Sequence, residues 1–179
     1  YAAYAYLKNL PHDDDRHVDN IVIIGPISSF RPWETEYLEC FGVEPKSFRL
    51  SGNAEVLNEG KLEHLYSARP SELTLIYHGG VDKFRDDLVD FLSRNKTMLV
   101  VDEAHKIKNP NGVWGKSVVK VSEKAVARVA LTGTPVPNGY QDLFNIFKFI
   151  YPYKYKEVLG FSYPNLENLT TSNKLESSN

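Results

Sequence analysis

Short runs of apolar residues recur along the chain, and each run ends at glycine, proline or polar residues. A run without polar alternation is typical of a strand that is buried on both faces, as in a parallel sheet. Between these runs, apolar residues are spaced three and four apart, which predicts helices with one buried face. The four predicted strands are Ile21–Ile24, Leu73–Tyr77, Met98–Val101 and Val129–Leu131.

Helices are predicted in the segments between these strands and at both ends of the series. Strands that alternate with helices form βαβ units, so we predict an α/β fold with a mainly parallel sheet and helices on both faces. The last predicted helix has Asn138 as N-cap, with Gln141 completing a capping box. The predicted helices cover residues 1–10, a segment that opens near Ser28–Pro32 and stops at Gly42, and the segments 59–68, 81–92, 114–124 and 138–151.

Composition narrows the class of protein. The 179 residues are 42% hydrophobic and 25% charged, which is ordinary for a globular domain. The net charge of −2 argues against a purely electrostatic DNA-binding protein, although a basic groove on one face remains compatible with it. Cys40 is the only cysteine, which excludes an internal disulfide and fits a reducing, intracellular setting. We expect no membrane association, because no apolar run approaches the ~20 residues of a membrane span.

Two carboxylates, Asp102 and Glu103, follow directly after the third predicted strand. Open α/β sheets bind ligands at the carboxyl ends of their strands. Adjacent acids at such a place suit nucleotide hydrolysis, in which one carboxylate holds Mg²⁺ and the other activates the attacking water. The alternative is a polar loop that merely caps the strand. His105 and the tail that ends at Pro110 favour the chemical interpretation.

Other polar clusters favour structural roles. The acidic run at 13–15 is interpreted as solvated, and Trp33 as a core residue. A lysine every four residues at Lys116, Lys120 and Lys124 indicates a solvated helix face, or alternatively a patch that follows phosphates. The other histidines show no metal-ligand spacing, and the chain lacks the His-Glu-x-x-His of zinc proteases. These histidines are His12, His17, His64 and His78.

Four segments together resemble the Swi/Snf-like ATPases of helicase superfamily two, of the DEAH-box type. Residues 102–110 (Asp-Glu-Ala-His-Lys-Ile-Lys-Asn-Pro) resemble motif II of that family, and residues 131–138 with the helix after them resemble motif III. Residues 21–36 are similar to motif Ia, and residues 75–78 fall where motif Ib belongs. The family usually carries Gln where this chain has Pro137, which we interpret as a subfamily variation.

The resemblance implies a domain organisation. Residues 1–152 would form a partial N-terminal RecA-like ATP-binding lobe, and residues 153–179 a partly disordered C-terminal extension. A phosphate-binding loop needs Gly, four residues and then Gly-Lys-Ser/Thr. The near match at 115–117 fails because Pro110 stands where the first glycine is required. We therefore expect the chain to begin downstream of that loop, and the sheet to lack the phosphate-loop strand and to expose an unpaired edge beside the motif III strand.

The resemblance also implies roles for individual residues. ATP and Mg²⁺ are the expected cofactors, with Asp102 holding Mg²⁺ through water and Glu103 activating the hydrolytic water. His105 would couple the nucleotide site to motif III. Double-stranded DNA is the expected partner, held through its phosphates, so that binding should weaken steeply with salt. Residues implied at the nucleotide are Thr132, Gly133 and Thr134, and those implied at DNA are Pro26, Ser28, Tyr77, His78 and Lys108.

The expected function is thus a fragment of a DNA-dependent ATPase that translocates on double-stranded DNA. The isolated chain is expected to hydrolyse ATP negligibly, because it lacks the phosphate-loop segment and the second RecA-like lobe, which stabilise charge on the phosphates. Both are expected as partners from the same parent protein. One alternative is a non-catalytic binding or scaffold module derived from such a lobe. Another is a DEAH-type RNA helicase, although those typically carry Ser-Ala-Thr rather than Thr-Gly-Thr at motif III. The expected location is intracellular: cytoplasmic if bacterial, which the Pro-Asn form of motif III favours, and nuclear if eukaryotic.

Overall fold

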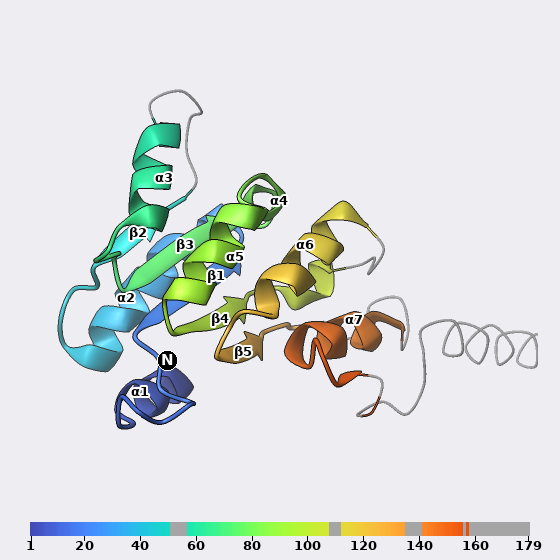
Figure 1. The fold of residues 1–179 in the computed structure, drawn as a ribbon, viewed down its shortest axis with the longest axis horizontal. Coiled ribbons are helices and arrows are strands. Elements are labelled where there is room, and N and C mark those ends of the chain that lie inside the picture. Colours follow the sequence, from blue (N-terminus) through green and yellow to red (C-terminus); the bar gives the residue numbers. More distant parts are fainter. Residues whose placement is uncertain (51–56, 108–111, 135–140, 156, 158–179) are drawn as a thin grey trace, which may run out of the picture.

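The computed structural model describes residues 1–50, 57–107, 112–134, 141–155 and 157. Its centre is one sheet of five parallel strands in the order β2-β3-β1-β4-β5 (Figure 1). The predicted α/β class with a parallel sheet is therefore confirmed. The strands are β1 (Asn20–Gly25), β2 (Ser47–Arg49), β3 (Leu73–Tyr77), β4 (Thr97–Val101) and β5 (Ala127–Ala130).

Helices cover both faces of the sheet. A parallel strand-to-strand crossover is nearly always right-handed, so the direction in which the chain moves along the sheet decides which face its helix covers. The chain moves from β1 out to β2 through α2, and then returns step by step through α3 to α6 toward β5, on the opposite face (Figure 1). The helices are α1 (Ala2–Lys8), α2 (Phe30–Phe41), α3 (Leu57–Tyr66), α4 (Gly80–Lys83), α5 (Arg85–Arg94), α6 (Val113–Ser122) and α7 (Gln141–Ile150).

Strand β1 lies at the centre of the sheet and supplies both halves of the core. Successive side chains of a strand point to opposite faces. Val22 and Ile24 pack into the cluster that α3 to α7 cover, whereas Ile21 and Ile23 pack with residues of α1 and α2. All six residues of β1 are buried, which explains why its middle four, Ile21–Ile24, form a continuous apolar run.

The sequence-based boundaries need three corrections. Strand β2 was not predicted, because three partly exposed residues at the edge of a sheet need no apolar run. The helix predicted over 81–92 is two helices, α4 and α5, interrupted at Phe84, where φ is −105° and ψ is 18°. Phe84 is nevertheless buried, so the apolar spacing persists across the break. The fourth strand spans 127–130 rather than 129–131.

Strand β5 forms one edge of the sheet, and β2 forms the other. Among the described residues β5 pairs with β4 alone, and all four of its residues are only partly buried. This agrees with the expected unpaired edge beside the motif III strand. The predicted N-cap Asn138 and nearly all of the predicted extension over 153–179 lie outside the described residues.

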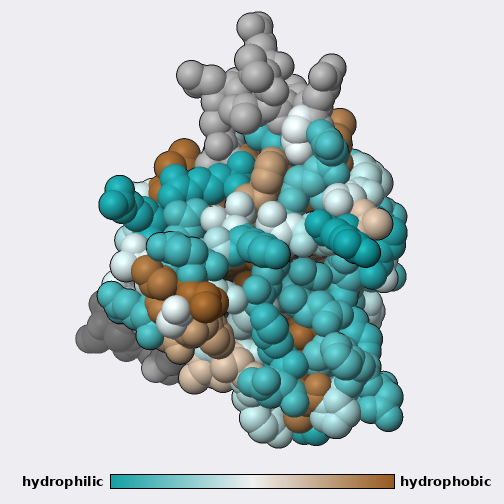
Figure 2. All heavy atoms as spheres, turned by 90° about the vertical axis from the view of Figure 1, so that its left-hand side faces the viewer, coloured by the Kyte–Doolittle hydropathy of each residue, from teal (hydrophilic) through white to brown (hydrophobic). Residues whose placement is uncertain are grey.

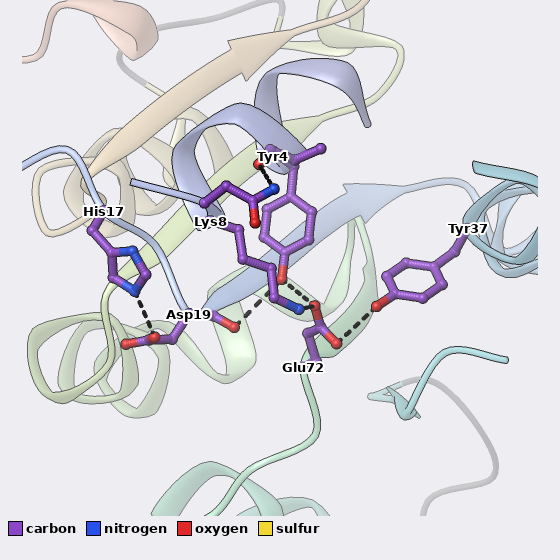
Figure 3. A network of polar contacts seen from close by, with 8 residues as sticks. Tyr4, Lys8, His17, Asp19, Tyr37 and Glu72 are labelled. Atoms are coloured by element: carbon purple, nitrogen blue, oxygen red, sulfur yellow. Dashed lines mark hydrogen bonds and ion pairs between the residues drawn. The ribbon is translucent and has the colours of Figure 1, made fainter. Parts of the chain in front are cut away.

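A polar network attaches α1 and α2 to the amino end of the sheet (Figure 3). The hydroxyls of Tyr4 and Tyr37 donate to the two carboxylate oxygens of Glu72, at 2.5 and 2.8 Å, and Lys8 forms an ion pair with the same group. Burial alone would raise the pKa of Glu72, but the hydrogen bonds from Lys8, Tyr4 and Tyr37 outweigh it and the pKa is lowered. Glu72 therefore stays ionised and holds both helices against the strands.

Hydrophilic residues predominate on the side that Figure 2 presents, and hydrophobic residues form one patch and a few isolated spots there. No helix in the described part of the chain combines the length and the apolar run that crossing a bilayer requires.

Candidate active site

The two predicted acids lie at the carboxyl edge of the sheet, between the ends of β1 and β5. The backbone N–H of Asp102 donates to the carbonyl of Ile24 at 2.7 Å. On the other side, the N–H of Ala104 donates to the carbonyl of Leu131 at 2.8 Å. The turn that carries the acids is therefore fixed to both neighbouring strands before any side chain contributes.

The carboxylate of Asp102 is held by two donors. Its Oδ1 accepts from the backbone N–H of Glu103 at 2.9 Å, and its Oδ2 accepts from the indole Nε1–H of Trp33 at 3.1 Å. A carboxylate has about four lone-pair sites, so roughly two remain for a water or a cation. Gly25 makes this approach possible, because a Cβ there would stand 3.2 Å from the Cβ of Asp102 and 2.9 Å from the Oγ of Ser29.

Glu103 occupies a backbone conformation that is unusual for a non-glycine residue. Its φ is 52° and its ψ is 50°, in the left-handed region, and it is the only non-glycine residue with positive φ in the described part of the chain. Its side chain is 44% exposed and forms an ion pair with Lys106 at 3.0 Å. The hydrogen bond and the charge of Lys106 lower the pKa of Glu103, which keeps it an ionised, solvent-facing carboxylate at neutral pH. Strained backbone of this kind tends to occur at functional sites.

His105 connects the acidic turn to the residues after β5. Its Nδ1 lies 2.9 Å from the Oγ1 of Thr132, and the same hydroxyl oxygen accepts from the backbone N–H of Thr134 at 3.2 Å. Gly133 and Thr134 are exposed beside it. The structure thus brings together all six residues that the sequence assigned to the nucleotide and its coupling.

The residues predicted at DNA follow the two strands on the other side of Asp102. Ser28 and Tyr77 are exposed and Pro26 is half-buried, at the ends of the adjacent strands β1 and β3. His78 is turned inward instead, with its Nε2 at 2.8 Å from the backbone carbonyl of Asp102. Lys108 lies outside the described residues.

His78 holds the acidic turn through a hydrogen bond to the backbone of Asp102. Burial lowers its pKa and outweighs the opposite effect of the Asp102 carbonyl, so the ring is neutral at pH 7. Because a carbonyl only accepts, Nε2 carries the proton and donates to it. A pocket of about 320 Å³ opens beside this contact. It is lined by His78, Gly79, Asp82, Lys106, Val113 and Trp114.

The sequence matches the SNF2-related domain family over residues 4–174. The chain belongs to the SNF2-related domain family. The DNA repair protein RAD5 of Yarrowia lipolytica is 32% identical over 155 residues, covering 76% of this chain and 14% of that protein. The DNA annealing helicase and endonuclease ZRANB3 of Bos taurus is 24% identical over 154 residues, covering 86% of this chain and 13% of that protein. The chain thus spans about a seventh of the length of these relatives.

A solved structure supports the architecture of this SNF2-related domain. The Sulfolobus solfataricus SWI2/SNF2 ATPase core in complex with dsDNA superimposes with a TM-score of 0.59 at 23% identity. The match covers 86% of this chain and 30% of that chain. At this identity the likeness shows the fold, and it confirms the predicted RecA-like sheet.

Two contacts that hold Asp102 in place were not predicted from the sequence. Trp33 was interpreted as a core residue only, yet its indole N–H reaches Asp102 from an element 69 positions away in the chain. His78 was assigned to DNA, which stays a prediction, and its ring also contacts the backbone of Asp102. No local spacing marks either contact, although an indole N–H near a buried strand end is a donor that needs an acceptor. In this SNF2-related domain both side chains hold the acidic turn in place.

Proposed function

We propose that this chain is the first-lobe part of a DNA-dependent ATPase that translocates on double-stranded DNA. The observation that carries the proposal is the junction at the carboxyl edge of the sheet, where Asp102 and Glu103 are linked to the Thr132 turn through His105 at 2.9 Å. Membership of the SNF2-related domain family supports the same assignment.

Within the proposal, Asp102 and Glu103 have separate tasks. Asp102 already accepts two N–H donors, which leaves its carboxylate suited to holding Mg²⁺ through a water molecule. Glu103 is ionised and faces solvent, as a general base for water must be. Lys106 competes for that carboxylate, so we expect the ion pair to open when the base acts. Mg²⁺–ATP, when bound, supplies the phosphoryl group that water attacks.

His105 and Thr132 are the proposed link between hydrolysis and movement. The hydroxyl of Thr132 can both donate and accept, so a shift of His105 changes the hydrogen bonds of the following turn. Gly133 and Thr134 are exposed and free of strand pairing. A change at the acidic turn is thereby transmitted along one hydrogen-bonded path to the end of β5.

The phosphate cradle is proposed to come from outside these 179 residues. The printed sequence contains no Gly-x4-Gly-Lys-Ser/Thr motif, and charge stabilisation by such a loop and by an arginine finger contributes factors as large as the base itself. The proposal therefore assigns catalysis to the complete protein, with a second RecA-like lobe as partner.

Double-stranded DNA is the proposed track, along the ends of β1 and β3. Ser28 and Tyr77 are exposed there, next to Pro26 and on the same edge as the acids. The solved relative was determined in complex with dsDNA, which supports this choice of partner. Neither the scaffold alternative nor the RNA-helicase alternative is favoured by the family match.

Substitution of the proposed base tests the function. In the complete protein, Glu103→Gln keeps the size and the hydrogen-bonding ability of the side chain but removes the base. We expect ATP binding to be retained and DNA-stimulated turnover to fall by about 10²–10⁴-fold. ATP binding is measured by fluorescence of a labelled nucleotide, and turnover by phosphate release with and without duplex DNA.

The matched control is Glu39→Gln, the same chemical change at an exposed position of α2. It should leave both measurements unchanged. Near-normal turnover in Glu103→Gln would show that the base is a different residue. A wild-type protein that binds DNA but never hydrolyses ATP would instead support the scaffold alternative.

A further inference from the structure

A second cluster of metal-ligand side chains lies in the loop between α1 and β1, at the amino ends of the strands, whereas Asp102 and Glu103 lie at the carboxyl ends. His12, His17 and Asp19 each offer one ligand atom, and these atoms all lie within 4.8 Å of one another. In sequence these histidines showed no ligand spacing. The fold of the loop brings the side chains together, and Figure 3 shows the ring of His17 directed at Asp19.

His17 is the buried member of the cluster, with 2% of its surface exposed. Its Nδ1 lies 2.9 Å from the backbone carbonyl of Leu10, and its Nε2 lies 2.8 Å from the Oδ1 of Asp19. Both partners are acceptors when the carboxylate is ionised, whereas a neutral imidazole has a single N–H. One ring nitrogen of neutral His17 therefore directs a lone pair at an acceptor. A metal ion between Nε2 and Asp19 removes this conflict, because it accepts the lone pairs of both groups.

Two further features favour a metal ion at this position. Histidines that bind metals commonly donate their other ring N–H to a backbone carbonyl, which fixes the ring, and the Leu10 carbonyl is placed to accept from Nδ1 of His17. In addition, the ring of His12 stands with its centroid 4.4 Å from that of His17. A second imidazole so close supplies another nitrogen ligand to a metal.

The geometry is near that of a tetrahedral site. Ligands at about 2.0–2.1 Å from Zn²⁺ lie about 3.3–3.4 Å apart. The distance from Nε2 of His17 to Asp19 would have to open by about 0.5 Å from its 2.8 Å, and His12 would have to close in by up to about 1.5 Å. Both movable side chains are exposed, so buried His17 can stay where it is.

The backbone of the loop is already anchored on the neighbouring segment. The ammonium of Lys96 donates to the carbonyl of His12 at 2.8 Å, and the N–H of Asp19 donates to the carbonyl of Lys96 at 2.8 Å. Both ends of the cluster are thus tied to the residue just before β4. Less ordering is then required when a metal binds.

We propose that His12, His17 and Asp19 form a binding site for a divalent transition-metal ion of the Zn²⁺ type, with water completing the coordination. Two nitrogens and one carboxylate oxygen suit Zn²⁺ and disfavour Mg²⁺ or Ca²⁺, which prefer oxygen ligands alone. A metal there would cross-link the loop between α1 and β1 and hold its two halves together.

Zinc titration of the metal-free protein tests the site. Excess Mg²⁺ is present, so that the carboxylates of Asp102 and Glu103 are occupied and do not compete for Zn²⁺. We expect one Zn²⁺ per chain by calorimetry, and His12→Ala and Asp19→Asn should each weaken its binding at least about 10-fold. Zn²⁺ at about 100 times its Kd should raise the Tm of the wild type by about 5–10 °C. The same addition should leave the Tm of His12→Ala nearly unchanged.

Asp15→Asn is the matched control, since Asp15 is an exposed acid of the same loop outside the cluster. Its zinc affinity should equal that of the wild type. Equal affinity in the wild type and His12→Ala, or the absence of binding, would overturn the proposal. Because a variant can misfold, anomalous diffraction at the zinc edge provides a second measurement on the wild type. A peak among the three side chains supports the site, and peaks only elsewhere refute it.

Discussion

Gly25 is the position where a single methyl group should disturb both the core and the site. It is the last residue of the fully buried strand β1, next to Asp102 at the end of β4. An added Cβ would stand 2.9 Å from the Oγ of Ser29, closer than real Cβ contacts come, and 3.2 Å from the Cβ of Asp102. The Oγ of Ser29 cannot rotate away without losing its 2.7 Å hydrogen bond to the carbonyl of Pro26.

The expected cost follows from this geometry. Inserting a methyl group into a well-packed core costs about 1–3 kcal/mol. For a domain of this size, each kcal/mol lowers the Tm by about 2–4 °C, so Gly25→Ala should unfold about 2–12 °C below the wild type. The measurement is thermal unfolding followed by circular dichroism. In the complete protein, DNA-stimulated ATP turnover should fall as well, because the clash displaces Asp102.

Two further variants test whether the clash is the cause. Gly60→Ala is the matched control, because nothing lies within 4 Å of a Cβ at that position in α3. It should raise stability by about 0.5–1 kcal/mol through helix propensity. Ser29→Ala removes the closer of the two contacts, so the double variant Gly25→Ala/Ser29→Ala should lose less than the sum of the single variants. A Gly25→Ala protein as stable as the wild type would refute the close packing between β1 and β4.

Two more predictions concern single buried contacts. Burial lowers the pKa of His64 to about 4. As the pH falls, His64 therefore becomes protonated in the unfolded chain before it does so in the folded chain. The stability that neutral His64 contributes is intact above pH ~6.5 and declines toward pH ~4, by at most about 1.4 kcal/mol per pH unit. Urea unfolding between these pH values should show a flatter dependence in His64→Phe, and equal slopes would contradict the assignment. Trp33→Phe keeps a ring but removes the N–H that Asp102 accepts. This substitution should lower the free energy of unfolding by about 1 kcal/mol, after discounting for partial exposure. If urea stability and ATP turnover were both unchanged, Trp33 would not position Asp102.

The sequence by itself determined the strands that are buried on both faces. Such strands are apolar at most positions, so β1, β3 and β4 are visible as short, largely apolar runs, and the residues that follow each run mark the carboxyl ends of the strands. The left-handed stop of α2 at Gly42, with φ of 71°, was also visible, because glycine is the residue that adopts this conformation without cost. Local sequence reports these features because their causes are local: periodicity, burial on both sides, and backbone freedom.

Tertiary structure alone decided which distant residues meet. The order β2-β3-β1-β4-β5 depends on the handedness of each crossover and on where each helix finds a partner, and no short segment contains that information. The three-residue edge strand β2, the indole of Trp33 on Asp102, and the gathering of His12, His17 and Asp19 all follow from it. Each depends on the distance between side chains in space, which the one-dimensional pattern of apolar and polar residues does not specify.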